Sequence, residues 1–164
     1  MRILSTAILL QLAAFAWGET DLPLAESVLV DKSERKMWLI HEGRKYREYN
    51  ISLGDSPVGH KEREGDEKTP EGSYVIDYRN PESRFYLSLH ISYPREEDKE
   101  RARRKGVMPG GNIFIHGLPN GLEKVSSSYA GRDWTDGCIA VNNQEIEELW
   151  ALIQDGTPIE ILHL

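Results

Sequence analysis

The sequence has 164 residues, with 27 acidic and 20 basic side chains and a formal net charge of −7 at pH 7. This acidic balance argues against nucleic acid as a partner, because a nucleic-acid-binding surface must neutralise phosphate charge. The length suits one domain with a single core and leaves no room for a second.

The first eighteen residues predict a cleavable secretory signal. They carry one charged residue, Arg2, followed by an apolar run over residues 3–12 and small residues up to Gly18. The alternative is an uncleaved membrane anchor, but the run is shorter than the ~20 residues that a membrane-spanning helix needs. We therefore expect one exported domain over residues 19–164, without a membrane anchor and located in the periplasm.

The rest of the chain predicts many short strands and few helices. Runs of β-branched, aromatic and polar residues predict strands at 27–31, 36–41, 46–53, 73–77, 85–90, 113–116 and 158–162. The polar stretch 54–68 is expected to be an exposed loop with a solvated, charged surface. Two helices are expected, a charged one over 96–105 that ends at Gly106, and one over 143–152 capped by Asn142 or Asn143. This pattern favours a mainly β sandwich with a few short helices.

The chain has a single cysteine, Cys138, within Thr135-Asp136-Gly137-Cys138-Ile139. In an exported protein this thiol has no intramolecular disulfide partner, so it is either a nucleophile or a buried, inert residue. His116 ends a short predicted strand upstream and is the candidate base. Gly137 would let backbone amides face an oxyanion, and Gly117 would let substrate approach the histidine strand.

These two segments resemble the YkuD-type L,D-transpeptidase family of bacterial cell-wall enzymes. Its signature is a His-Gly at a strand end and then Ser/Thr-x-Gly-Cys before an apolar residue, as in His116-Gly117 and 135–139 here. The segments 68–74 and 157–161 extend the resemblance. Asp136 stands where many members carry histidine, and Ala140 where many carry arginine. The segments 89–94 and 109–112 are more similar to the YafK-like branch.

The resemblance implies a β-sandwich enzyme in which Cys138 is the nucleophile and His116 the acid and base. The amides of Asp136, Gly137 and Cys138 would stabilise the oxyanion, with Thr135 shaping the turn. The donor would be a peptidoglycan tetrapeptide stem, and no organic cofactor or metal is implied. The acceptor stays open between a diaminopimelate amine, a lysine of a wall-linked lipoprotein, and water. Arg132 is a candidate substitute for the arginine missing at Ala140.

Two further interpretations remain. Cys138, His116 and His90 could form a zinc site, although the closely spaced ligand pairs typical of such sites are absent. The same fold could also hold peptidoglycan strands without catalysis, as a binding module. His90, Tyr93, Tyr129 and Trp134 are further candidates for a substrate groove, with core packing as the alternative for each aromatic residue.

Overall fold

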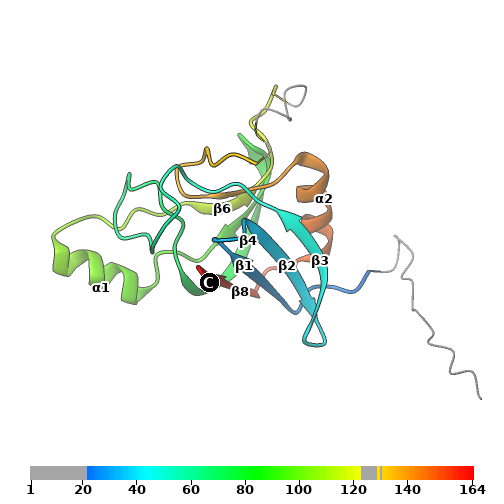
Figure 1. The fold of residues 1–164 in the computed structure, drawn as a ribbon, viewed down its shortest axis with the longest axis horizontal. Helices are drawn as coiled ribbons and strands as arrows, with labels where there is room; N and C mark the ends of the chain where they lie inside the picture. Colours follow the sequence, from blue (N-terminus) through cyan, green and yellow to red (C-terminus); the bar gives the residue numbers. More distant parts are fainter. Residues whose placement is uncertain (1–21, 123–128, 130) are drawn as a thin grey trace, which may run out of the picture.

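The computed structural model describes residues 22–122, 129 and 131–164. In this part of the chain, eight strands form one mixed sheet, and two helices lie at opposite ends of the molecule (Figure 1). The strands are β1 (Ser27–Asp31), β2 (Lys36–His41), β3 (Arg44–Asn50), β4 (Gly72–Ser83), β5 (Tyr86–Ile91), β6 (Ile113–His116), β7 (Ile139–Ala140) and β8 (Thr157–Leu162). The helices are α1 (Glu96–Lys105) and α2 (Asn143–Leu152). The predicted mainly β class is confirmed, whereas the predicted signal lies outside the described residues.

The strands follow the order β3-β2-β1-β8-β4-β5-β6-β7. The last strand of the chain therefore lies between β1 and β4, parallel to β1 and antiparallel to β4. The β6 and β7 strands are also parallel. Because the last strand pairs with the first, the two ends of the described chain are held in the same sheet.

The two edges of the sheet meet, so that the sheet is curled. Just after β3, Ser52 bridges Ala140 of β7, and Gly54 bridges Thr135. The backbone amides and carbonyls of Ser52 and Ala140 exchange two hydrogen bonds of 2.9 Å. The predicted strand over 46–53 therefore ends early as β3, because its last residues pair with the segment around Cys138 instead.

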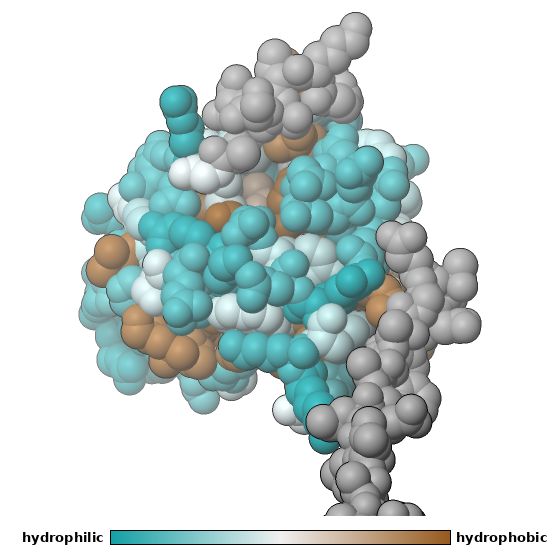
Figure 2. All heavy atoms as spheres, turned by 45° about the vertical axis from the view of Figure 1, so that its right-hand side comes forward, coloured by the Kyte–Doolittle hydropathy of each residue, from teal (hydrophilic) through white to brown (hydrophobic). Residues whose placement is uncertain are grey.

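One apolar core fills the space inside the curled sheet. Its members alternate along the strands, as Val28 and Val30 do on β1 and Ile113 and Ile115 on β6. Helix α2 covers this core with Ile146 and Leu149 and begins with the predicted cap, in which the Asn142 side chain accepts from the Glu145 amide. The surface drawn in Figure 2 is mostly hydrophilic, with small separate apolar areas.

The loop between β3 and β4 is exposed over much of its length, as expected, but not all of its charged side chains form a solvated surface. The ammonium of Lys61 is buried against Asp66 at 2.7 Å. Desolvation opposes charge on Asp66, but hydrogen bonds from Lys61 and three backbone amides hold its pKa below the usual range. Fully buried Lys32 donates to the carbonyls of Gly59 and Thr69 and to the carboxylate of Glu71. These contacts fix the loop against the sheet.

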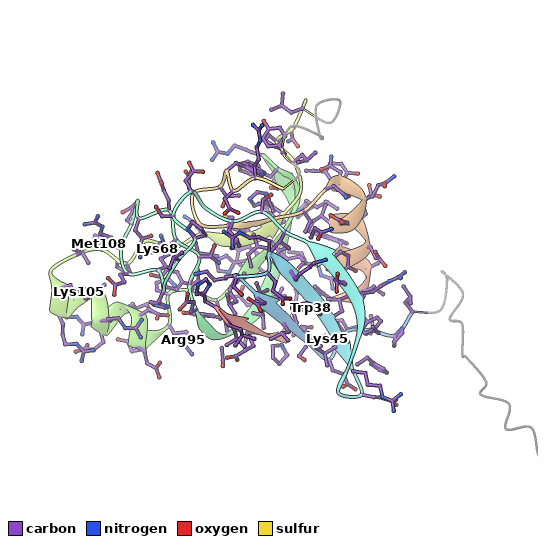
Figure 3. All side chains as sticks on the ribbon, viewed as in Figure 1. Trp38, Lys45, Lys68, Arg95, Lys105 and Met108 are labelled. Carbon is purple, nitrogen blue, oxygen red and sulfur yellow. The ribbon has the colours of Figure 1, made fainter. Side chains whose placement is uncertain are left out.

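Helix α1 lies beyond this loop, at the end of the molecule where Figure 3 labels Lys105 and Met108. It spans the predicted residues and ends at Gly106, whose φ of 66° is left-handed. Only Asp98 and Ala102 are buried, so the expectation of an exposed helix is confirmed.

Candidate active site

The pairing of β6 with β7 brings the predicted thiol and imidazole to one face of the sheet. Ile115 pairs with Ile139 and His116 with Ala140, so Cys138, the residue before β7, lies opposite Phe114. Side chains alternate along a strand, and Ile113, Ile115 and Ile139 face the core. Phe114, His116 and Cys138 therefore share the opposite face.

A pocket of about 610 Å³ opens on this face and is lined by both His116 and Cys138. Thr135 and Asp136 also line it, together with the aromatic rings of Phe85, Phe114 and Trp134 and the polar residues Asn80, Arg84, Ser88 and Asn112. Four of the six predicted site residues thus lie on the pocket wall. Gly117 and Gly137 lie behind that wall.

His116 is held in one tautomer by its own chain. Its Nδ1 lies 2.7 Å from the carbonyl oxygen of Gly117, which can only accept a hydrogen bond, so the ring proton is on Nδ1. Nε2 is therefore free to accept a proton. The rings of Phe85 and Trp134 pack on the imidazole at 4.4 Å and 5.7 Å between centroids. This burial lowers the pKa of His116 to about 4, so the ring is neutral at pH 7.

Cys138 is half-buried, and its Sγ lies 3.6 Å from the carbonyl oxygen of Asn112. Burial raises the pKa of the thiol to about 11, and the negative charge of Asp136 adds to that rise. A hydrogen bond from the Phe114 backbone and the charge of Lys61 act in the opposite direction. Both shifts favour the neutral forms of the thiol and the imidazole at pH 7.

The turn before Cys138 is held by the Thr135 hydroxyl. This hydroxyl donates to the carbonyl of Cys138 at 2.8 Å and accepts from the amide of Gly137 at 3.2 Å. Gly137 has a φ of 116°, and a Cβ there would lie 2.5 Å from the carbonyl oxygen of Lys68. Only glycine fits this position. The loop between β3 and β4 therefore packs directly behind the cysteine turn.

Gly117 also has a steric reason to lack a side chain. A Cβ at this position would lie 2.7 Å from Asn143 Oδ1 and 3.1 Å from Ile146 Cγ2, both on α2. Asn143 Oδ1 accepts the amide of Leu118. The glycine thus seats the end of β6 against the start of α2, while its carbonyl orients His116. The predicted contact of Gly117 with substrate stays a prediction.

Ala140 lines a second pocket, of about 500 Å³, on the other side of Trp134. Arg35 also lines this pocket, but its guanidinium is already paired with Asp133 at 2.7 Å. Arg132 is exposed and lies on the wall of neither pocket. Arg84 is the arginine on the wall of the pocket that holds the thiol, and no motif in the sequence pointed to it.

Among the described residues, no three His, Cys, Asp or Glu side chains gather in a group that could hold a metal ion. His90, the third ligand of the zinc interpretation, instead places Nδ1 2.6 Å from Asp77 and stacks on Tyr78. Cys138, His116 and His90 are therefore not arranged as a set of zinc ligands.

The chain matches the YkuD family, the L,D-transpeptidase catalytic domain, over residues 25–161, and it belongs to this family. It is 29% identical over 132 residues to YafK of Escherichia coli K12, which is named as an L,D-transpeptidase, and this supports the predicted branch. The match covers 77% of this chain and 46% of YafK. YqjB of Bacillus subtilis, named in the same way, is 26% identical over 145 residues, or 88% of this chain and 75% of YqjB.

Solved structures give the same fold. The helical cell shape determining protein Pgp2 from Campylobacter jejuni aligns with a TM-score of 0.62 and 28% identity over 83% of this chain and 46% of that one. An L,D-transpeptidase from Xylanimonas cellulosilytica shares the fold, with a TM-score of 0.55 and 17% identity over 86% of this chain and 62% of that one. The chain thus spans about half the length of YafK and of Pgp2. Within the described residues, no helix is long and apolar enough to cross a membrane.

Proposed function

We propose that this protein is a peptidoglycan L,D-transpeptidase that works through a thioester on Cys138. The observation that carries the proposal is that Cys138 and His116 share one pocket wall, with the imidazole tautomer fixed for proton acceptance at Nε2. Membership of the L,D-transpeptidase catalytic domain family supports the same chemistry.

In the first half of the reaction, Cys138 attacks the carbonyl at the L-centre of the third stem residue. Since thiol and imidazole start neutral, the Sγ proton passes to His116 Nε2 as the S–C bond forms. The tetrahedral intermediate then loses its C–N bond. His116 returns the proton to the departing amine of the terminal D-alanine, and a thioester remains.

The oxyanion of that intermediate needs backbone donors. Of the three predicted amides, that of Gly137 is bonded to the Thr135 hydroxyl, so we assign the role to the amides of Asp136 and Cys138. The two hydrogen bonds of the Thr135 hydroxyl, to the Gly137 amide and to the Cys138 carbonyl, would hold these amides in place.

We further propose that Arg84 binds a carboxylate of the donor stem. It is the cation that shares the pocket wall with the thiol, whereas Ala140 offers no charge where many family members carry arginine. A guanidinium suits this task because it binds a carboxylate through two parallel hydrogen bonds.

In the second half, an amine attacks the thioester and gives its proton to His116, the C–S bond breaks, and the thiolate is reprotonated. A diaminopimelate amine would give a cross-link, and a lysine of a wall-linked lipoprotein would give an attachment. Water would instead give a shortened stem, which is the hydrolase alternative. This chemistry belongs outside the cytoplasm, in keeping with the predicted signal over residues 1–18 and a periplasmic location.

Mass spectrometry of tetrapeptide muropeptides tests the proposal. They are incubated with the protein and with Cys138→Ala, with and without a lipoprotein peptide. A dimer or a peptide adduct that forms only with the intact thiol supports the transpeptidase, and the product names the acceptor. If a tripeptide is the only thiol-dependent product, the protein is a hydrolase and not a transpeptidase.

A second measurement separates catalysis from mere binding. A carbapenem should add its mass to the protein once and not at all to Cys138→Ala, because a thioester requires the thiol. His116→Gln should slow this addition by ~10²-fold or more, the usual size of a lost general base. Absence of any thiol-dependent product or adduct would leave the binding module as the function.

A further inference from the structure

Aromatic side chains continue the row of residues that ends in the thiol. Tyr78 of β4 pairs with His90 of β5, His90 pairs with Phe114 of β6, and Phe114 lies opposite Cys138. One line across β4, β5 and β6 therefore runs from the exposed Tyr78 to Cys138, the residue before β7. The next line holds Asn80, Ser88 and His116 and forms part of the pocket wall.

A β-bulge builds this row. Ile76 pairs with Ile91 in the core, but the register shifts at Asp77, so that Tyr78 pairs with His90 on the outer face. Without the extra residue, the pleat would turn Tyr78 to the same face as Ile76. The bulge also places the Asp77 carboxylate 2.6 Å from His90 Nδ1. A large ring is thus directed outwards, and its neighbour is held in orientation.

The three rings form a compact platform that is open to solvent at Tyr78, whereas the His90 side chain is only 14% exposed. Tyr78 and His90 stack at 4.4 Å with 19° between their planes. The Phe114 ring meets both edge-on, at 6.0 Å and 4.9 Å. Tyr78 remains 44% exposed, and Phe114 lines the pocket that holds Cys138. The platform is therefore the direct extension of that pocket along the sheet.

We infer that this platform, formed by Tyr78, His90 and Phe114, binds the sugar ring to which the donor stem is attached. The inference rests on the proposed function. A pyranose ring has an apolar face of C–H groups that packs on aromatic rings, while its hydroxyl and acetamido groups need polar partners. The Asp77 carboxylate, 41% exposed beside the platform, offers such a partner.

The distances agree with this occupant. Strands lie about 4.7–4.9 Å apart, so the backbones of His90 and Tyr78 stand roughly 10 Å and 14 Å from that of Cys138 along the row. The Tyr78 ring leans back toward the thiol, because its centroid lies 6.0 Å from that of Phe114. The attacked carbonyl belongs to the third residue of the stem, and three extended residues span about 10–11 Å. With the carbonyl at Cys138, the sugar would reach the exposed ring of Tyr78, which lies over His90. On the other side of β7, the 52–54 segment closes the sheet.

The experiment compares a disaccharide-linked tetrapeptide with the same tetrapeptide freed from its sugars. We expect kcat/KM of the wild-type protein to be about tenfold higher for the linked substrate, equivalent to ~1.4 kcal/mol. In Tyr78→Ala the ratio should fall to about one, through KM. Tyr78→Phe keeps the ring and should retain the tenfold ratio. Val75→Ala, which shortens an exposed apolar side chain on the same strand, should retain this ratio as well.

The possible results are distinct. Turnover of both substrates with the same ratio in wild type and Tyr78→Ala would overturn the inference and leave the proposed function intact. If neither substrate reacts, binding decides: the disaccharide alone is titrated into Cys138→Ala and followed by NMR. Shifts at Tyr78, His90 and Phe114 that disappear in the double variant with Tyr78→Ala would support the sugar site without catalysis, and their absence would refute it.

Discussion

The buried imidazole should make stability depend on pH in a way that His116→Gln removes. Burial lowers the pKa of His116 from 6.5 to about 4. Between these values the unfolded chain binds a proton that the folded protein does not. This contribution to stability is therefore fully present above pH 6.5 and is lost as the pH falls toward 4.

The size of the effect follows from the shift. The full difference between the two pKa values corresponds to about 3 kcal/mol. Going from about pH 7 to about pH 4.5 covers most of that window, so His116 alone should remove about 2 kcal/mol from the free energy of unfolding. The glutamine of His116→Gln does not titrate, so it binds no proton in the unfolded chain or in the folded protein.

Urea unfolding of the wild-type protein and His116→Gln at both pH values measures this directly. Other titrating groups, such as Asp31 and Asp66, contribute to both proteins and cancel in the difference. The wild type should lose about 2 kcal/mol more than the variant. Equal losses would show that the imidazole keeps its ordinary pKa in the folded protein, and the lowering of that pKa by burial argued above would then be wrong.

Further substitutions test the cysteine turn and the loop behind it. Gly137→Ala should destabilise the protein by about 2–4 kcal/mol in urea unfolding, because the new Cβ meets the Lys68 carbonyl. Gly43→Ala is the control: this glycine also has a positive φ but open space around it, so the variant should cost about 1 kcal/mol. Thr135→Val should lower the free energy of unfolding by about 1–2 kcal/mol, because two hydrogen bonds are lost. Thr135→Ser keeps the hydroxyl and should retain most of that stability. Equal stability of the two variants in thermal or urea unfolding would show that these hydrogen bonds do not stabilise the turn. Asp136→Asn should shift the pH profile of thiol alkylation to lower pH, because a negative charge that raises the pKa of Cys138 is removed, and Asp155→Asn, an exposed carboxylate paired with Arg79, should leave that profile unchanged.

Much of the fold follows from local patterns in the sequence. The strand and helix positions were predictable from alternation, caps and glycines, and Asn142 and Gly106 delimit α2 and α1 as expected. The length of β4 was not predictable in this way. Its residues Asn80, Pro81 and Glu82 are typical of a turn, and yet they continue the strand. Pairing with β5 overrides that local preference.

The candidate site was predictable in part. The single cysteine, the two His-Gly and Gly-Cys motifs and the family resemblance indicated Cys138 and His116, which line one pocket, but not the residues that support them. Phe85, which packs on the imidazole, and Lys68, whose carbonyl lies behind Gly137, come from segments with no chemical signal of their own. The buried pair of Lys61 and Asp66 looked like surface charge, because short-range patterns cannot show that a loop folds back onto the sheet.

The two departures from the common family pattern act at different places. Asp136 lies on the wall of the thiol pocket, and its charge raises the pKa of Cys138. Ala140 instead faces the second pocket, beyond Trp134, and its backbone closes the sheet against Ser52. The first departure therefore bears on the acidity of the Cys138 thiol. The second leaves space of about 500 Å³ next to the site, where a long cationic side chain would otherwise stand. Under the proposed function, carboxylate binding near the thiol would fall to Arg84, which lines the thiol pocket from the turn between β4 and β5.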